Sequence, residues 1–233
     1  MVVLFLMWLF GVSINEAPQP SGNRVAVISS PAESHDEDSR FVAVMLRDTE
    51  DVWSDLFQRT GRVYQKPVLV LYSGEIQSGC GLAMSDGGPF YCPDDKRLYL
   101  DLGFYRELRD EFGAPGDFAQ AYVIAHEVGH HVQNQLGLTR QEASSIQLEL
   151  QADFLAGVWA HHAQERWKFL QRGDVEEALV CAAAIGDDRL QIQSQGYVTP
   201  ERFTHGTSEQ RVKWFKKGLA SGKLEDGKLE DIR

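Results

Sequence analysis

The chain has 233 residues, of which 43% are hydrophobic and 24% are charged, and its formal net charge at pH 7 is −11. This composition is typical of a globular protein that has enough chain for one large core. The acidic balance, with no dense block of Lys and Arg, excludes the basic face of a nucleic-acid-binding protein, so we expect no nucleic-acid partner. The KWFKK run at 213–217 is better interpreted as the solvated face of a helix.

The first residues of the chain, MVVLFLMWLFGVSI at 1–14, are apolar and uncharged. They are shorter than the ~20 apolar residues of a membrane span and lack the basic start of a signal peptide. Three interpretations stay open: a clipped membrane anchor, an atypical export signal, or a buried core strand. We favour a remnant anchor or export signal, which predicts that the N-terminus meets the membrane.

Residues 15–40 are rich in proline, serine and acidic side chains, which predicts a flexible acidic linker. We expect a folded domain over residues 41–220. At its start, RDTEDVWSDLFQRTG predicts a helix that is capped by Asp48 and ended by Gly61. The run KPVLVLYSG, the loop-like stretch 80–92 and the alternating RLYLDL predict a small sheet of two or three strands.

The three cysteines differ in their surroundings. Cys80 and Cys92 lie in a Gly-rich stretch, and their spacing fits no zinc-ribbon pattern, which needs close CxxC pairs. If the chain is exported, these two are the natural disulfide pair. A loop of this size would contribute ~3 kcal/mol to stability. Cys181 lies in an apolar helical run and is interpreted as a buried free thiol.

From residue 117 onward the pattern is helical. Residues that resemble capping boxes open each expected helix, and the expected ranges are 117–137, 144–167, 174–186 and 207–218. Residues 221–233 contain the unit GKLED twice. Five residues is too short a period for a solenoid, so we expect a solvated polar tail.

The first of these helices contains the segment AYVIAHEVGHHVQNQLG. His126 and His130 are four residues apart in it, which places both imidazoles on one face, where they can share a metal ion. Glu127 can reach a metal-bound water, and the three residues form the H-E-x-x-H pattern. His131 is rotated off this face, so we expect it to support the site or to pack.

A catalytic zinc needs a third protein ligand and one open position. An extended pattern with a third histidine fails, because Leu136 stands at its place. The second helix offers Glu149 and, four residues later, Asp153, within the apolar stretch LELQADFLAG. Two carboxylates are costly to bury there unless zinc meets Glu149 and an imidazole N–H meets Asp153. His161 and His162 are interpreted as a helix-end pair without a metal role.

With these residues in place, the chain resembles the neutral zinc metallopeptidases of bacteria, whose wider relatives are the thermolysin-like gluzincins with H-E-x-x-H followed by E-x-x-x-D. The resemblance covers most of residues 48–218, in the segments DTEDVWSDLF, GCGLAMSDGGPFYCPDDKRLYLDL, DFAQAYVIAHEVGHHVQNQLG, LELQADFLAGVWAHH, EALVCAAAIGDDRLQ and FTHGTSEQRVKWF. It implies an α+β fold, in which a small mixed or antiparallel sheet packs on a mainly helical, zincin-like (minigluzincin) domain. The active-site helix would lie between the two.

The resemblance also implies the role of each residue. His126, His130 and Glu149 would hold one zinc ion, Glu127 would be the catalytic general acid/base, and Asp153 would orient a liganding histidine. It further implies a protein of the cell envelope that is anchored in the membrane by its N-terminus. The catalytic domain would then lie outside the cytoplasm, in the periplasm or the extracellular space.

Such a site predicts hydrolysis of peptide bonds in a protein or peptide substrate. Zinc held by two imidazoles and a carboxylate would lower the pKa of its bound water toward ~7. Glu127 would take the proton as this water attacks the carbonyl and would deliver it to the leaving amine. His205 is the candidate second donor to the oxyanion, with Arg211 and Tyr197 behind it. The substrate would extend along the strand that follows Cys80.

Two alternatives stay open at this stage. The protein is either a non-catalytic zinc-binding scaffold or regulatory protein of the cell envelope, or a hydrolase of another amide or ester. Glu127 favours catalysis, because a structural zinc site has no use for that acid and closes its fourth position with a ligand.

Overall fold

The computed structural model describes residues 36–84, 88–101, 103–110, 113, 116–138 and 143–232, with only the backbone for 36–38 and 105–107. The expected anchor or export signal at 1–14, and most of the expected linker, lie outside the described residues. Among the helices that are described, none combines the length and the apolar character that a membrane crossing requires.

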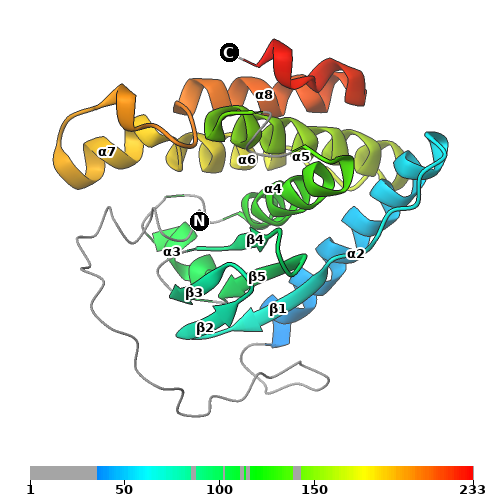
Figure 1. Cartoon of the computed structure of the whole chain (residues 1–233), viewed down its shortest axis with the longest axis horizontal. Helices are drawn as coiled ribbons and strands as arrows, with labels where there is room; N and C mark the ends of the chain where they lie inside the picture. Colours follow the sequence, from blue (N-terminus) through cyan, green and yellow to red (C-terminus); the bar gives the residue numbers. More distant parts are fainter. Residues whose placement is uncertain are drawn as a thin grey trace.

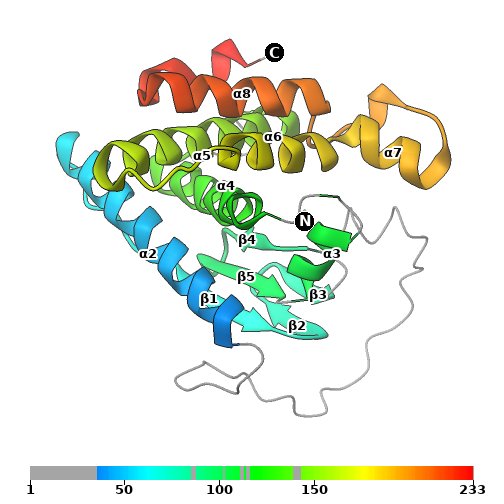
Figure 2. The ribbon, with the colours of Figure 1, turned by 180° about the vertical axis from the view of Figure 1, so that it is seen from behind.

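The described residues form an α+β fold, which confirms the predicted class. A small sheet lies at one side of the molecule and a stack of helices at the other, and helix α4 (Asp117–Leu136) runs between them (Figure 1). The reverse view shows the same order of layers (Figure 2). Because α4 is covered from both sides, most of its residues are buried.

The sheet is mixed and has the order β1-β5-β4. Strand β1 (Val68–Tyr72) pairs in parallel with β5 (Arg97–Asp101), and β4 (Phe90–Cys92) pairs antiparallel with β5. Strands β2 (Glu75–Ser78) and β3 (Gly81–Met84) form a separate antiparallel hairpin. Of these strands β4 lies nearest to α4, so the edge of the sheet borders the helix that carries the H-E-x-x-H pattern.

The helical layers are formed mainly by segments after residue 144. Helix α5 packs on α4, and α8 packs on the far side of α5, while α2 crosses beside α4 and α5. The remaining elements are α2 (Asp36–Arg59), α3 (Phe104–Asp110), α5 (Ser145–Trp167), α6 (Asp174–Ala184), α7 (Asp187–Gln195), α8 (Ser208–Ser221), and the 3-10 turns η2 (Pro200–Arg202), η3 (Leu224–Gly227) and η4 (Leu229–Asp231).

Glycines allow three of these helices to approach closely. A Cβ on Gly218 would overlap a backbone carbonyl oxygen of α5, and a Cβ on Gly157 would overlap one of α8. In the HEVGH segment, a Cβ on Gly129 would lie 3.0 Å from the carbonyl oxygen of Ala152. Helices α4, α5 and α8 therefore pack backbone against backbone, which brings polar side chains on their facing sides within hydrogen-bonding distance.

The predicted capping residues are confirmed at some helix ends and are wrong at others. Helix α5 begins with the predicted capping box of Ser144, and α8 with that of Thr207. Helix α4 ends at Gly137 in the left-handed conformation, as predicted. The boxes expected at residues 117 and 174 are absent, because the N-cap residues of α4 and α6 are Gly116 and Gly173, which have no side chain to cap with.

Two boundaries differ from the prediction because packing extends the elements. Helix α2 starts at Asp36 rather than near Asp48, since Val42 and Met45 continue its buried face before Asp48, and its first turn lies in the expected linker. Helix α8 passes Gly218 and ends at Ser221.

The expected solvated tail is wrong for the described residues. The 3-10 turn η3 lies against α5 and α8, and η4 lies against α5. Ile232 is only 1% exposed, and Leu224 and Leu229 pack partly against the core. The GKLED repeat places one leucine of each copy on the inner side, which is why a segment of polar composition still packs.

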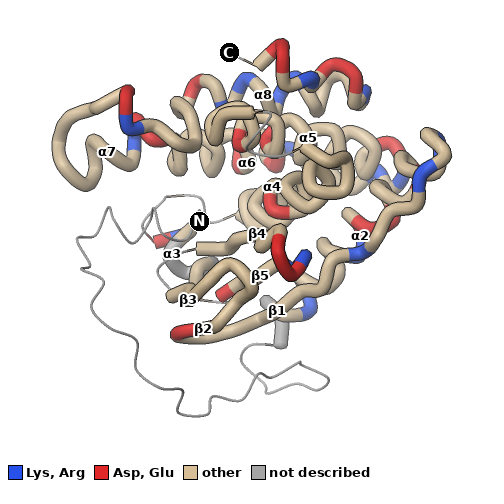
Figure 3. The backbone as a smooth tube through the Cα atoms, in the orientation of Figure 1, with Lys and Arg blue, Asp and Glu red and all other residues tan. Residues whose placement is uncertain are grey.

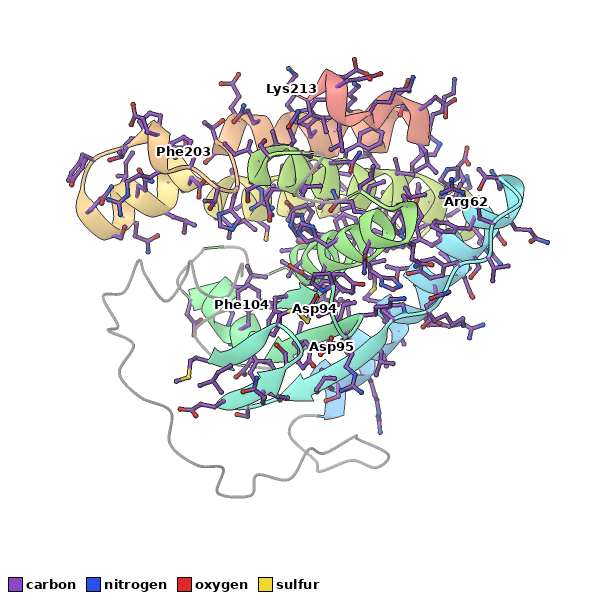
Figure 4. The ribbon with its side chains drawn as sticks, in the orientation of Figure 1. Arg62, Asp94, Asp95, Phe104, Phe203 and Lys213 are labelled. Carbon is purple, nitrogen blue, oxygen red and sulfur yellow. A yellow bond between two sulfur atoms is a disulfide. The ribbon has the colours of Figure 1, made fainter. Side chains whose placement is uncertain are left out.

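The positions of the charged residues and the pairing of the cysteines match the predictions from the sequence. Lys213 lies exposed on the outer side of α8 (Figure 4), whereas Trp214 and Phe215 beside it are buried, so only the lysines of the KWFKK run lie on the solvated face of the helix. In the described part, Lys and Arg are scattered among acidic residues along the helices (Figure 3). Cys80 and Cys92 form the predicted disulfide, which ties the β2–β3 hairpin to β4.

Candidate metal centre

Three side chains from α4 and α5 converge on one point. The rings of His126 and His130 lie one helical turn apart, with 4.8 Å between their centroids. Oε2 of Glu149 lies 3.2 Å from Nε2 of His126 and 3.5 Å from Nε2 of His130. One ligand atom from each residue lies within 4.8 Å of the others, so the group can hold a metal ion. The structure thus brings together the three residues that the sequence selected.

The ionisation of these side chains is coupled. Burial lowers the pKa of His126, but Asp153 and Glu149 outweigh it and raise the pKa to about 9. Burial opposes ionisation of Glu149 as well, yet the imidazoles hold the pKa of its carboxyl well below the ordinary value. The donor set of two imidazole nitrogens and an anionic carboxylate is one that zinc commonly takes.

The orientation of His126 is set by Asp153, as the sequence predicted for that aspartate. Nδ1 of His126 lies 2.8 Å from Oδ1 of Asp153, which leaves Nε2 to face Glu149. Arg211 from α8 donates to both oxygens of Asp153, from Nε at 2.8 Å and from Nη2 at 2.9 Å. The hydroxyl of Tyr122 donates to the same carboxylate. Burial raises the pKa of Asp153, but Arg211 and His126 lower it to about 2.

The orientation of His130 is set by a residue that the sequence analysis missed. Nδ1 of His130 lies 2.9 Å from Oε1 of Gln133, one turn further along α4, and Gln133 is only 3% exposed. Its spacing of three residues from His130 on one helix was the available signal.

Glu127 lies at the boundary between α4 and the sheet. Burial raises the pKa of its carboxyl, and the charges of His130 and His126 together with a hydrogen bond to the backbone of Tyr91 only partly offset this rise. Tyr91 belongs to β4. The strand that directly follows Cys80 is β3, which pairs with β2, whereas the strand that contacts Glu127 is β4.

Comparison with known proteins identifies the family. A family model described as "Putative neutral zinc metallopeptidase" matches residues 2–228. The chain belongs to this family. "Uncharacterized protein YpfJ" of Escherichia coli strain K12 is 48% identical over 238 residues, which cover 95% of this chain and 82% of that protein. "Uncharacterized protein Rv2575" of Mycobacterium tuberculosis strain H37Rv is 46% identical over 177 residues, 68% of this chain and 60% of that protein. No solved structure matches the chain.

His205 precedes α8, and its side chain is 14% exposed. Its Nδ1 lies 3.0 Å from Oδ1 of Asp187, and the backbone N–H of His205 donates to Oδ2 of the same carboxylate at 2.6 Å. His205 also makes a small contribution to the low pKa of Glu149, so its ring lies within electrostatic range of the metal cluster. Asp187, only 3% exposed, was missed because its partner is eighteen residues away in sequence.

The two residues expected behind His205 lie elsewhere. Arg211 binds Asp153 rather than His205, because the close packing of α5 and α8 brings it to that carboxylate. Tyr197 is 62% exposed, in the loop between α7 and η2.

The other described histidines, His131, His161 and His162, lie outside the cluster. His131 binds the hydroxyl of Tyr91 through Nδ1, at 3.0 Å, and a backbone carbonyl through Nε2, so it supports packing, as expected. His161 and His162 donate to carbonyl oxygens at the end of α8, each at 2.8 Å. The helix end that they serve is therefore that of α8, whereas α5 itself continues to Trp167.

Proposed function

We propose that the protein is a zinc-dependent peptidase in which His126, His130 and Glu149 hold one zinc ion. The observation that carries the proposal is the convergence of two Nε2 atoms on one buried, anionic carboxylate, in a chain of a zinc metallopeptidase family. A bound zinc ion would supply a Lewis acid that activates water and polarises the peptide carbonyl.

Glu127 is the proposed general acid/base. It adjoins both imidazoles of the cluster, and its raised pKa suits a group that accepts and returns a proton. In the proposed reaction Glu127 takes a proton from the attacking water. It then donates that proton to the amine nitrogen as the peptide C–N bond breaks, so one water is consumed and the products are a carboxylate and an amine.

His205 is the proposed donor to the oxyanion of the tetrahedral intermediate. Asp187 accepts a hydrogen bond from Nδ1 of His205 and thereby orients the imidazole ring, whose Nε2 is the proposed oxyanion donor. This arrangement divides the work between two elements: α4 supplies the acid/base, and the segment before α8 supplies the oxyanion donor.

The proposed substrate is a protein or peptide that extends along β4, the strand that borders Glu127. The disulfide supports a location in an oxidising compartment outside the cytoplasm. The apolar residues 1–14 are the proposed membrane contact. A nucleic acid is not a proposed partner, because the net charge is −11.

The test compares wild type with Glu127→Gln, and with Glu165→Gln as a control on an exposed glutamate of α5. Zinc content is measured by elemental analysis. Cleavage is measured with casein and with a quenched peptide library. Wild type and control should bind zinc and cleave, whereas Glu127→Gln should bind zinc and lose ~10²–10⁴-fold in rate. Equal cleavage by wild type and Glu127→Gln would refute the proposal. Bound zinc without cleavage in any variant would instead favour a non-catalytic scaffold.

A further inference from the structure

A chain of hydrogen bonds joins His130 to the end of the protein. His130 Nδ1 lies 2.9 Å from Oε1 of Gln133. Nε2 of Gln133 donates at 3.0 Å to Oε1 of Gln151 on α5. Nε2 of Gln151 donates in turn at 2.8 Å to the carbonyl oxygen of Gly227 in η3. Gln133 and Gln151 are only 3% and 6% exposed, so water does not replace these bonds easily.

The direction of this chain is fixed from its far end. A backbone carbonyl only accepts, so Gly227 requires an N–H of Gln151 and thereby turns the oxygen of Gln151 toward Gln133. Gln133 must then present its amino group to that oxygen and to the carbonyl of Leu148, 2.7 Å away. The oxygen of Gln133 is left for His130, whose Nδ1 has to carry the proton. In the neutral imidazole, Nε2 of His130 therefore keeps its lone pair for the cluster.

The C-terminal segment, residues 222–232, is seated so that this contact forms. A Cβ on Gly227 would overlap the ring of Phe154, so glycine allows the carbonyl to come this close to α5. Gln147, one turn before Gln151, holds the same segment by donating to the carbonyls of Leu229 and Ile232, at 3.0 and 3.2 Å.

We propose that the C-terminal segment is part of the metal centre, because it fixes the tautomer of His130 through Gln151 and Gln133. The two glutamines are positioning residues. This inference rests on the proposed zinc site. Each imidazole then has its own support: a charged Asp153–Arg211 pair orients His126, and a neutral amide relay orients His130.

The test uses Gln151→Leu, which keeps the approximate size of the side chain and removes both bonds. Gln147→Leu is the matched control, because it removes two other bonds to the C-terminal segment and leaves the bonds of Gln151 to Gly227 and Gln133 in place. Zinc affinity is measured by competition with a chelator. The ¹H–¹⁵N correlation spectrum of the imidazoles reports the His130 tautomer in metal-free protein at alkaline pH.

We expect Gln151→Leu to weaken zinc binding by about tenfold and Gln133→Leu by up to about a hundredfold, the range found when the support of a liganding histidine is removed. Gln147→Leu should bind zinc as wild type does. The Nδ1–H form of His130 should dominate in wild type and Gln147→Leu and should decline in Gln151→Leu.

Equal zinc affinities and equal tautomers in Gln151→Leu and Gln147→Leu would overturn the inference. If wild type binds no zinc, the proposed function fails on its own. The tautomer in metal-free protein then decides: a loss of the Nδ1–H form in Gln151→Leu alone supports the relay, and an unchanged spectrum overturns it.

Discussion

Replacing Gly218 with alanine probes the contact between α5 and α8 directly. The added Cβ would overlap the carbonyl oxygen of Phe154 and would lie 2.9 Å from the backbone nitrogen of Val158. Carbon–oxygen contacts settle at about 3.3 Å or more, so α8 has to retreat from α5 by about 1 Å. Arg211 moves with α8, and its bonds to Asp153, now 2.8 and 2.9 Å, would stretch beyond hydrogen-bonding distance.

The cost follows from these displacements. Overpacking costs about 1–3 kcal/mol, and weakening a buried ion pair adds to it, so we expect the free energy of unfolding to fall by about 3 kcal/mol. For a domain of this size that loss lowers Tm by roughly 6–12 °C in calorimetry of metal-free protein. Zinc affinity, measured by chelator competition, should fall as well. Lys213→Ala, exposed on the same helix, is the control. A Gly218→Ala protein with wild-type Tm and zinc affinity would refute the backbone contact.

The remaining predictions concern the disulfide, the end of the chain and one buried carboxylate. Replacing Cys80 and Cys92 together with serine should lower the free energy of unfolding in guanidinium titrations by ~3 kcal/mol, because the unfolded chain is no longer cross-linked. Ile232→Ala should lower it by ~2–4 kcal/mol, because this side chain is 1% exposed. Burial raises the pKa of Asp187, but the hydrogen bonds and charge of His205 lower it below the ordinary 3.8. Its stabilising contribution is therefore complete above pH 3.8 and is lost as pH falls through the lower folded value. In urea titrations of metal-free protein, the difference between wild type and Asp187→Asn should be constant near neutral pH and should shrink below pH 3.8.

Each of these results has a contrary outcome. Identical unfolding of wild type with and without reductant would show that the cross-link contributes nothing. An Ile232→Ala protein as stable as wild type would show that the C-terminal segment does not pack on the core and is the solvated tail that its composition indicates. A difference for Asp187→Asn that grows on acidification would mean that the folded protein raises the pKa of Asp187.

The parts of the site that follow helix periodicity were predictable from sequence. His126, Glu127 and His130 are placed by spacing within one helix, and Glu149 and Asp153 by the same spacing within the next. The cost of burying two carboxylates among apolar residues indicated that they meet partners, and the structure places both beside imidazoles. The disulfide followed from the surroundings of its cysteines.

The rest depends on side chains that meet from distant segments, for which local pattern gives no signal. Nothing near Arg211 in sequence indicates that it binds Asp153, because that bond arises from the glycine contact between α5 and α8. Glu177 shows the same limit. It resembles a cap of its own helix, yet its carboxylate accepts the backbone N–H of Phe118 at the start of α4. Composition likewise misplaced the C-terminal segment, whose packing depends on two leucines and Ile232.

Cys181 gives the protein a native probe of internal motion. Of the three cysteines it is the one outside the disulfide, it is 0% exposed on α6, and burial raises the pKa of its thiol to about 12. A thiol reagent can modify it only after α6 parts from its neighbours, so the labelling rate counts those openings. Arg211 and Asp153, which support the metal cluster, lie within electrostatic range of this sulfur. Slower labelling in the presence of zinc would therefore show by how much a bound metal ion suppresses the opening of α6.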